Sequence, residues 1–391
     1  MTLRHPGAER VVVLGCSGSI GTQAADVIER SDGRLQCVGL AAGRDWRTAV
    51  EQARRLGVDR IAIADPDGAR EAAEAFDGQV LSGPDGVLEL AIGSGADLVL
   101  NAIVGAAGLG STLAALGEGI DVALANKESL VVGGQLVTGL AEATGARLWP
   151  VDSEHTALAQ LLAATTPGEV RRLIVTASGG PFREWGADAI AGATVEQALA
   201  HPTWRMGGKI TIDSATMMNK GLELIEAHHL FGVPMEKIDV LVHPQSIIHG
   251  LVDLHDGAQL AHLGHPDMRV AISWALHRGT SVSLPTKTLD LAEVGQLTFE
   301  APDEARFPCL RLAREAQATG GGAPCVLNAA NEVAVHAFLD GRVPFGAIPE
   351  VVEATLERDG DFPVSHASQL LAIDRRARET AEAIVDRLVA A

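Results

Sequence analysis

The stretch VVVLGCSGSIG at residues 11–21 decides the fold of the first part of this chain. Four apolar residues form a strand-like run, and glycines then recur at 15, 18 and 21 before a helix-like segment that continues to Arg30. Glycine permits a tight turn and close approach of the backbone to a pyrophosphate, which also gains from the positive end of the following helix. A glycine motif alone is weak evidence, but its place between a strand and a helix favours a dinucleotide site over a structural turn.

The same alternation of strand and helix continues to about residue 149. Strand-like runs at 11–14, 35–41, 60–64, 97–104 and 121–125 are separated by alanine-rich helical stretches. This pattern predicts parallel βαβ units. After Pro150 the order changes, and a helix at 156–164 with strands at 171–176, 210–212 and 240–243 predicts an α+β region with a mixed sheet.

The last part of the chain is predicted to be helical. Residues 281–308 show little helical periodicity, whereas 327–338, 348–357 and 367–388 have helical spacing. We therefore predict an α/β protein with four parts: a Rossmann-like, dinucleotide-binding domain at 1–149, an α+β domain at 150–280, a linker at 281–308 and a C-terminal helical domain at 309–391.

Composition limits the partners and the compartment. The chain has 391 residues with 50 Asp and Glu against 31 Lys and Arg, a formal charge of −19, which disfavours nucleic acid as a partner. Its four cysteines lack metal-binding or paired spacing, as expected of free thiols in a reducing compartment. No signal peptide is evident, so a cytoplasmic protein is predicted. The uncharged run at 98–117 contains Asn101, Ser111 and Thr112, which favours a strand, loop and helix over a membrane span.

The end of the second predicted strand distinguishes the two nicotinamide cofactors. NAD sites commonly place a carboxylate there for the ribose hydroxyls, whereas this chain has Ala42, Gly43 and Arg44. A guanidinium at this position pairs well with a 2′-phosphate, so NADP is favoured over NAD. Asp45 is a mild objection, because its carboxylate either turns away or holds Arg44, and the sequence does not decide between these arrangements.

Two acidic residues in PVDSEH at 150–155 indicate a metal site. On an extended backbone, the side chains of Asp152 and Glu154 share a face. Paired oxygen ligands at the end of a strand suit a hard cation such as Mg²⁺ or Mn²⁺, which keeps positions open for substrate oxygens. A solvated polar turn is the alternative, and this hexapeptide does not distinguish the two.

A second polar region has the features of an anion site. The turn at 176–181, TASGGP, offers a hydroxyl and free backbone N–H groups. In DSATMMNKGLE at 213–223, Ser214 is predicted to cap a helix that ends at Gly232, and Lys220 adds positive charge. Glu223 lies one helical turn after Asn219 and could complete a set of three carboxylates, but a solvated glutamate is the commoner case and Glu226 is a rival.

Several motifs together resemble one family over nearly the whole chain. They are ANKESL at 125–130, PVDSEH at 150–155, ASGGPF at 177–182, HPTWRMG at 201–207, DSATMMNKGLE at 213–223, HPQS at 243–246 and LNAANE at 327–332. In this order they resemble the 1-deoxy-D-xylulose 5-phosphate reductoisomerases. The resemblance implies a homodimeric enzyme that uses NADPH and a divalent cation, Mg²⁺ or Mn²⁺. It would rearrange the carbon skeleton of its sugar phosphate substrate, 1-deoxy-D-xylulose 5-phosphate, and reduce the resulting aldehyde to give 2-C-methyl-D-erythritol 4-phosphate for isoprenoid synthesis.

The resemblance also implies roles for particular residues. The metal ligands would be Asp152, Glu154 and Glu223, and the catalytic residues Lys127, Glu154 and His201. The substrate would contact Lys127, Ser153, Glu154 and Glu223, with its phosphate end held chiefly by Ser178, His201, Ser214, Asn219 and Lys220. The NADPH site would be lined by Ser17, Gly18, Ser19, Ile20, Gly43, Arg44, Asp45, Asn126, Glu128 and Gly207.

A closing segment is expected at 201–208, where two glycines allow motion and Trp204 and Met206 can exclude water from the site. The chain departs from the family pattern at Cys16 and Ser17, at Asp45, at Ala177, where glycine is common, and at Gly208, where arginine is common. Asn328, Asn331 and Glu332 are interpreted as satisfied core side chains. The rival functions are a metal-independent NADP-dependent dehydrogenase or semialdehyde reductase and, more remotely, a non-catalytic NADP sensor.

Overall fold

The computed structural model describes residues 7–390 except 167, 205 and 361. Its contacts divide the chain into two compact units. The first comprises Met1–Ser129, Val137–Thr156 and Asp267–Pro285, and the second Leu130–Leu136, Ala157–Pro266 and Thr286–Ala391. One boundary falls inside a continuous helix, α7 (Ser153–Ala163). The predicted domains at 1–149, 150–280 and 309–391 with their linker remain predictions.

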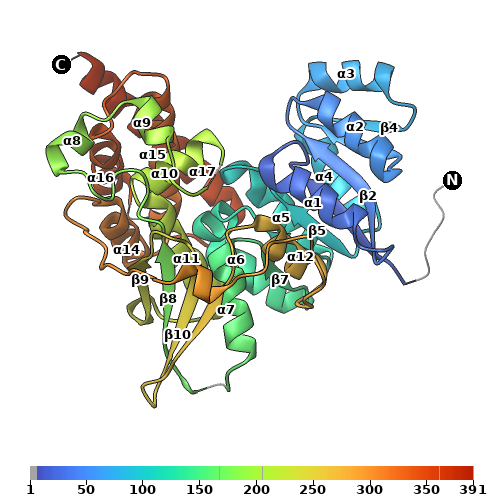
Figure 1. The fold of residues 1–391 in the computed structure, drawn as a ribbon. Coiled ribbons are helices and arrows are strands. Elements are labelled where there is room, and N and C mark those ends of the chain that lie inside the picture. Colours follow the sequence, from blue (N-terminus) through green and yellow to red (C-terminus); the bar gives the residue numbers. More distant parts are fainter. Residues whose placement is uncertain (1–6, 167, 205, 361, 391) are drawn as a thin grey trace. The chain divides into compact units, whose positions relative to one another are not determined.

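The first unit is built on a seven-stranded sheet in the order β4-β3-β2-β1-β5-β6-β7 (Figure 1). Every neighbouring pair of strands is parallel, which confirms the Rossmann-like architecture. The strand β4 was not among the predicted strands, and its QVLS sequence contains only two apolar residues. The strands are β1 (Glu9–Leu14), β2 (Leu35–Ala42), β3 (Arg60–Ile63), β4 (Gln79–Ser82), β5 (Leu98–Asn101), β6 (Asp121–Leu124) and β7 (Leu148–Pro150).

Strand order places the ligand-binding edge of this sheet. β1 pairs with β2 on one side and with β5 on the other, so the chain direction of the crossovers reverses at β1. Ligands of such sheets bind beyond the carboxyl ends of the strands at the reversal point. The helices of this unit are α1 (Ser19–Glu29), α2 (Trp46–Leu56), α3 (Pro66–Ala75), α4 (Gly83–Gly93), the short η1 (Ala106–Gly108), α5 (Leu109–Gly117), most of α6 (Glu128–Thr144) and α12 (Met268–Leu276).

The second unit contains a four-stranded mixed sheet in the order β11-β10-β8-β9. β8 and β9 are parallel, and the other pairs are antiparallel. The mixed sheet confirms the α+β character predicted for this region. Its strands are β8 (Val170–Ala177), β9 (Ile238–Val242), β10 (Ile248–Leu254) and β11 (Gln259–Leu263).

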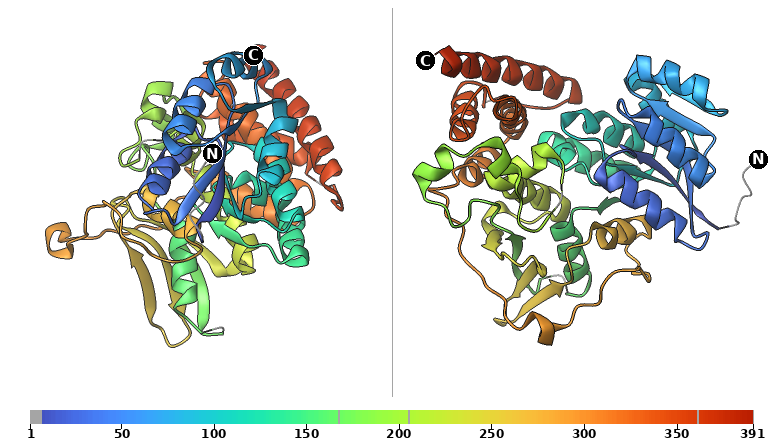
Figure 2. Two further views of the ribbon diagram at one scale, coloured as in Figure 1. Left: turned by 90° about the vertical axis from the view of Figure 1, so that its right-hand side faces the viewer. Right: turned by 45° about the horizontal axis from the view of Figure 1, so that its top comes forward.

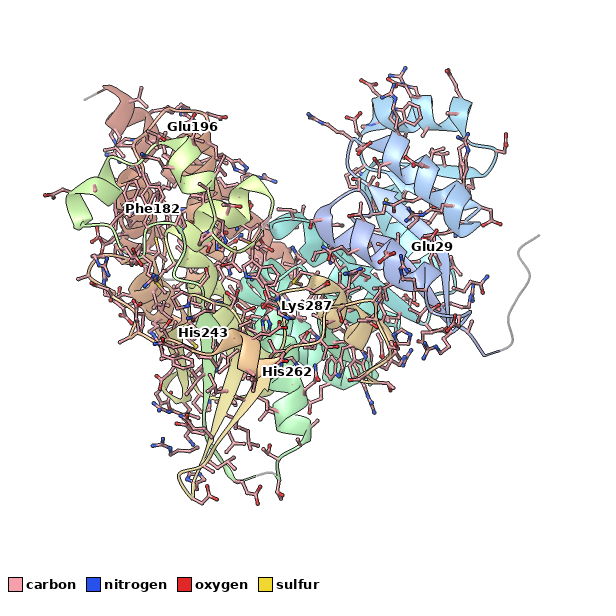
Figure 3. The ribbon with its side chains drawn as sticks, viewed as in Figure 1. Glu29, Phe182, Glu196, His243, His262 and Lys287 are labelled. Atoms are coloured by element: carbon pink, nitrogen blue, oxygen red, sulfur yellow. The ribbon has the colours of Figure 1, made fainter. Side chains whose placement is uncertain are left out.

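Besides parts of α6 and α7, the described residues of the second unit form ten further helices, and the last three pack against one another (Figure 2). Phe182 is fully buried in its core, with its ring centroid 4.8 Å from Trp185 and 5.0 Å from Phe345 (Figure 3). None of the described helices has both the length and the apolarity needed to span a membrane. The helices are α8 (Ala187–Ala191), α9 (Val195–Leu199), α10 (Gly208–Ala215), α11 (Met218–Phe231), η2 (Met235–Lys237), α13 (Leu291–Val294), α14 (Cys309–Thr319), α15 (Ala323–Leu339), α16 (Ala347–Asp359) and α17 (Ala367–Ala390).

Two local predictions in the second unit are wrong. The strand expected at 210–212 is part of α10, whose N-cap is Gly207. The β-branched run is short. The hydroxyl of Thr211 donates to the Gly207 carbonyl at 2.8 Å, so this hydroxyl has a hydrogen-bond partner within the helix. Ser214 does not cap α11, because it lies in the last turn of α10 and α11 begins at Met218. The predicted end of that helix at Gly232 is confirmed by its left-handed backbone.

Candidate functional site

The glycine turn after β1 leaves no room for side chains at two positions. Gly15 has φ +81°, and a Cβ added there would lie 2.4 Å from the Ala102 carbonyl oxygen. A Cβ at Gly21 would lie 2.3 Å from the Gly15 oxygen, so helix α1 packs directly on the turn. Gly18 is the N-cap of α1 and offers no capping side chain, which leaves the positive helix end to an anion. Burial raises the pKa of the Cys16 thiol to about 12, so this departure adds only a neutral side chain.

The structure answers the question that Asp45 raised. Asp45 is the N-cap of α2, and its carboxylate accepts the backbone N–H of Thr48 at 3.1 Å. The Asp45 carboxylate therefore caps the N-terminus of α2. Arg44 is exposed at the carboxyl end of β2, where a 2′-phosphate is expected.

Asn126 follows β6 at the same edge of the sheet and is buried. Its Nδ2 donates to the carbonyls of Ile103 at 2.7 Å and Gly105 at 2.8 Å, and to Glu128 at 3.0 Å. Its Oδ1 accepts the Ser129 N–H at 3.0 Å. The side chain of Asn126 thus ties the loop after β5 to the start of α6, and it shapes the edge of the sheet by holding backbone.

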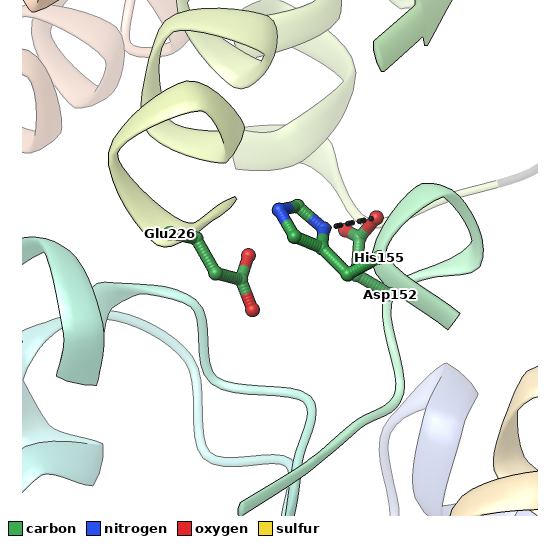
Figure 4. Close-up of side chains that lie close together, drawn as sticks. All are labelled: Asp152, His155 and Glu226. Carbon is green, nitrogen blue, oxygen red and sulfur yellow. Dashed lines mark hydrogen bonds and ion pairs between the residues drawn. The ribbon is translucent and has the colours of Figure 1, made fainter. Parts of the chain in front are cut away.

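The acidic motif lies where β7 passes into α7. Asp152 Oδ2 is 2.7 Å from Lys127 Nζ, and both side chains are largely buried, at 14% and 7% exposure. Its Oδ1 is 3.2 Å from Nδ1 of the fully buried His155 (Figure 4). The extended backbone expected through Glu154 is absent, because Asp152 Oδ1 also accepts the Glu154 N–H and α7 begins at Ser153. The first turn of α7 therefore determines the positions of the Asp152 and Glu154 carboxylates.

The carboxylate of Glu223 is buried in α11, so it is not a solvated helix residue. Its side chain is 1% exposed, and its two oxygens accept hydrogen bonds from Asn219 and Lys220. Lys220 is itself 6% exposed. The one-turn spacing expected between Asn219 and Glu223 is thus present as a direct hydrogen bond, and the charge of the carboxylate is balanced by an ammonium.

Two groups of described side chains have ligand atoms close enough to hold a metal ion. In one, atoms of Asp152, Glu154 and Glu223 lie within 4.8 Å of one another. In the other, the atoms belong to Asp152, His155 and Glu226. His155 is a residue to which the sequence assigns no role. The first group offers only oxygen, the donor that Mg²⁺ and Mn²⁺ prefer, whereas the imidazole of the second suits softer transition metals.

Asn219 and Lys220 donate to Glu223, whereas the other expected phosphate-binding residues, Ser178 and Ser214, meet at His201. Its Nε2 is 3.0 Å from the Ser178 hydroxyl and 3.1 Å from the Ser214 hydroxyl. Its Nδ1 accepts the backbone N–H of Trp204 at 2.9 Å, which places the ring proton on Nε2. Burial lowers the pKa of His201 to about 4, so the imidazole is neutral at pH 7 and acts as a hydrogen-bond donor.

Two glycines bring the turn after β8 close to Ser214. Gly179 and Gly180 have φ of +83° and +66°, and a Cβ at Gly180 would lie 2.7 Å from the Ser214 carbonyl oxygen. Ala177 is not among the described residues with positive φ, so the alanine found there in place of glycine causes no strain.

The segment expected to close contacts a histidine that the sequence analysis left without a role. The ring centroid of Trp204 is 6.4 Å from that of His249 on β10. Burial, followed by the neighbouring His262, lowers the pKa of His249 to about 4, so this contact is with a neutral ring. Arg205 of the same segment lies outside the described residues.

Comparisons with known proteins agree along the chain. Residues 11–134 match the sequence model of the 1-deoxy-D-xylulose 5-phosphate reductoisomerases, and residues 148–231 and 263–380 match models of C-terminal domains of the same enzymes. The reductoisomerase of Symbiobacterium thermophilum is 50% identical over 378 residues, 95% of this chain and 97% of its own length. That of Caulobacter vibrioides is 49% identical over 385 residues, 96% of each chain.

Solved structures give the same result. The reductoisomerase of Zymomonas mobilis in complex with NADPH has a TM-score of 0.89 at 45% identity, covering 97% of this chain and 99% of that one. A DOX-P reductoisomerase in complex with NADPH, fosmidomycin and magnesium has a TM-score of 0.91 at 38% identity, covering 97% and 98%. The chain belongs to the 1-deoxy-D-xylulose 5-phosphate reductoisomerase family.

Proposed function

We propose that this chain converts 1-deoxy-D-xylulose 5-phosphate to 2-C-methyl-D-erythritol 4-phosphate with NADPH and a divalent cation held by Asp152, Glu154 and Glu223. The enzyme is an NADP-dependent oxidoreductase that also isomerises its substrate. Family membership at 50% identity carries this conclusion. A metal-independent dehydrogenase is not favoured, because related structures contain magnesium as well as NADPH.

The residues present suit the proposed cation. The three carboxylates supply only oxygen ligands. A Mg²⁺ or Mn²⁺ ion held by three carboxylates keeps coordination positions open for substrate oxygens. When bound, such a cation polarises the carbonyl of a ketose as a Lewis acid. The side chains around it have separate tasks: Ser153 and Lys127 contact the substrate, and Lys127 places positive charge beside Asp152.

The phosphate end of the substrate is assigned to the residues around His201. Neutral His201 donates from Nε2, the Ser178 and Ser214 hydroxyls add donors, and Lys220 supplies charge with Asn219 beside it on α11. These groups orient the sugar phosphate and retain the aldehyde until it is reduced. Trp204 and Met206 exclude water when the segment at 201–208 closes.

NADPH is assigned to the carboxyl edge of the parallel sheet, with its pyrophosphate at α1 and its 2′-phosphate at Arg44. Ser17 to Ile20 follow β1, Gly43 to Asp45 follow β2, and Asn126 and Glu128 follow β6, so one edge holds these three segments. Gly207, the N-cap of α10, completes the proposed set.

Arg44→Ala is expected to weaken NADPH binding about 10- to 100-fold and to change NADH binding less than twofold, because a charged hydrogen-bond pair with the 2′-phosphate is lost. Fluorescence titration of each reduced cofactor measures both constants. Arg47→Ala is the matched control, since that guanidinium lies over the Trp46 ring at 4.4 Å and pairs with Glu71. Equal losses for the two cofactors would remove the assignment.

The function as a whole is tested by following nicotinamide absorbance. Oxidation of NADPH is expected only when deoxyxylulose phosphate and Mg²⁺ or Mn²⁺ are both present. A chelator should stop the reaction, and added Mg²⁺ should restore it. Turnover that persists in chelator would favour the metal-independent reductase, and a chain that never oxidises NADPH would contradict the proposal.

The proposal extends to a homodimer in the cytoplasm. β11 is an edge strand of the four-stranded sheet and ends in the exposed Leu263, and such edges are sites for pairing with another chain. All four cysteines are free and buried, as suits a reducing compartment. Equilibrium sedimentation is expected to give the mass of two chains.

A further inference from the structure

A buried polar link joins α15, in the C-terminal part of the chain, to α10, and the proposed function does not use it. Asn331 on α15 donates from Nδ2 to Oδ1 of Asp213 at 2.8 Å, across 118 positions of sequence. The other oxygen of Asp213 lies 2.8 Å from Nζ of Lys209, one turn earlier in α10. Asn331 is fully buried and the Asp213 side chain is 1% exposed, so this carboxylate is neutralised inside the protein (Figure 1 shows α10 and α15).

The residue held by this link adjoins the proposed phosphate site. Asp213 immediately precedes Ser214, whose hydroxyl is 3.1 Å from His201 Nε2. Two residues further on, Thr216 Oγ1 accepts the Met218 N–H at 3.3 Å, and Met217 between them has φ +60°. A non-glycine residue rarely adopts this backbone, so surrounding contacts must hold the junction of α10 and α11 in place.

The chemistry of Asn331 does not match that of a core-filling residue. Its Oδ1 is buried and has no hydrogen-bond partner among the described residues, a cost that an apolar side chain of similar size would avoid. The contribution of the Asn331 amide is therefore the hydrogen bond that Nδ2 donates to Asp213. Asn328, one turn earlier, is equally buried and also has an unpartnered Oδ1, but its Nδ2 donates to Glu332 of the same helix.

We propose that Asn331 is a positioning residue for the phosphate subsite: by fixing Asp213 from α15, it sets the place of the Ser214 hydroxyl beside His201. This inference rests on the proposed assignment of Ser178, His201 and Ser214 to the substrate phosphate. The C-terminal helices thereby have a role in substrate affinity in addition to their packing. Asn331 is not among the residues assigned to substrate or cofactor, so its effect is proposed to pass through Asp213.

Asn331→Leu tests the proposal, because leucine has a similar volume and no donor. The KM for deoxyxylulose phosphate and the Kd of inorganic phosphate are both expected to rise about tenfold, the effect of one hydrogen bond to a charged group. The kcat should stay within threefold of the parent and the KM for NADPH within twofold. Steady-state kinetics give kcat and both KM values, and calorimetry with phosphate alone gives the Kd of inorganic phosphate.

Asn328→Leu is the matched control, since it removes the same buried amide from the same helix without touching Asp213. It should leave the KM and the phosphate Kd within twofold. The exchanged pair Asp213→Asn with Asn331→Asp keeps one hydrogen bond between the helices and should recover most of the lost affinity. If Asn331→Leu does not fold, Asn331→Ala carries the same expectation.

Unchanged phosphate affinity in a folded Asn331 variant would overturn the inference, as would an equal loss in Asn328→Leu. Failure of the proposed function gives a different result. In that case the parent chain would not oxidise NADPH with deoxyxylulose phosphate, whatever the variants do to phosphate binding.

Discussion

Glu223→Gln is expected to reduce kcat about 10³-fold or more, while the Kd of NADPH stays within twofold. Glutamine keeps the size of the side chain and removes its charge, so the proposed cation loses one of three carboxylates. The amide also turns a donor toward Lys220 or Asn219, both of which donate to Glu223. Single-turnover kinetics and fluorescence titration of NADPH measure the two quantities separately.

Glu226→Gln separates the two candidate ligand groups. Glu226 lies on the same helix, is also fully buried, and belongs to the group that contains Asp152 and His155. The binding of Mn²⁺ in the absence of substrate is measured from the loss of the electron paramagnetic resonance signal of the free ion. This measurement reports on the metal site independently of turnover. We expect Glu223→Gln to abolish Mn²⁺ binding and Glu226→Gln to leave it measurable. The reverse result would assign the cation to the group with His155.

Local patterns predicted the features that depend on neighbouring residues. The glycine turn is one example, because Gly15 and Gly21 fit one another within seven residues of sequence. The end of α11 at Gly232 is another, since a left-handed C-cap needs only one glycine. The parallel sheet followed from strands that alternate with helices, a rule that acts over some thirty residues.

Features that depend on distant contacts were missed or mistaken. The run at 210–212 has β-branched residues but forms a helix, because Thr211 and Ile212 are buried within the second unit and tertiary packing outweighs a weak propensity. The link from Asn331 to Asp213 spans 118 positions and has no local signal. The contact of the buried His249 with Trp204 likewise depends on a side chain that the fold brings to it.

Opposite changes in metal affinity and activity are expected for Lys127→Met. Lys127 Nζ lies 2.7 Å from Asp152 Oδ2 and balances the charge of this proposed ligand carboxylate inside the protein. A unit charge about 4 Å from another contributes about 4 kcal/mol at an effective dielectric constant of 20, so the ammonium opposes a nearby divalent cation. Methionine keeps the length of the side chain and removes that charge. The Kd of Mn²⁺ should therefore fall at least about tenfold, while turnover falls because Lys127 is proposed to contact the substrate.

Stability adds an independent readout for the same variant. Removing one partner of a buried ion pair costs about 3–5 kcal/mol, so Lys127→Met should unfold at lower denaturant concentration when no metal is present. Added Mn²⁺ should raise its midpoint more than that of the parent, because the cation replaces the missing charge. Lys287→Met is the control, since that lysine is 69% exposed and pairs with Glu293 at 3.4 Å. A weaker Kd for Mn²⁺ in Lys127→Met would show that the lysine helps to hold the ligand carboxylates in place, and the proposed balance of charge at Asp152 would then be wrong.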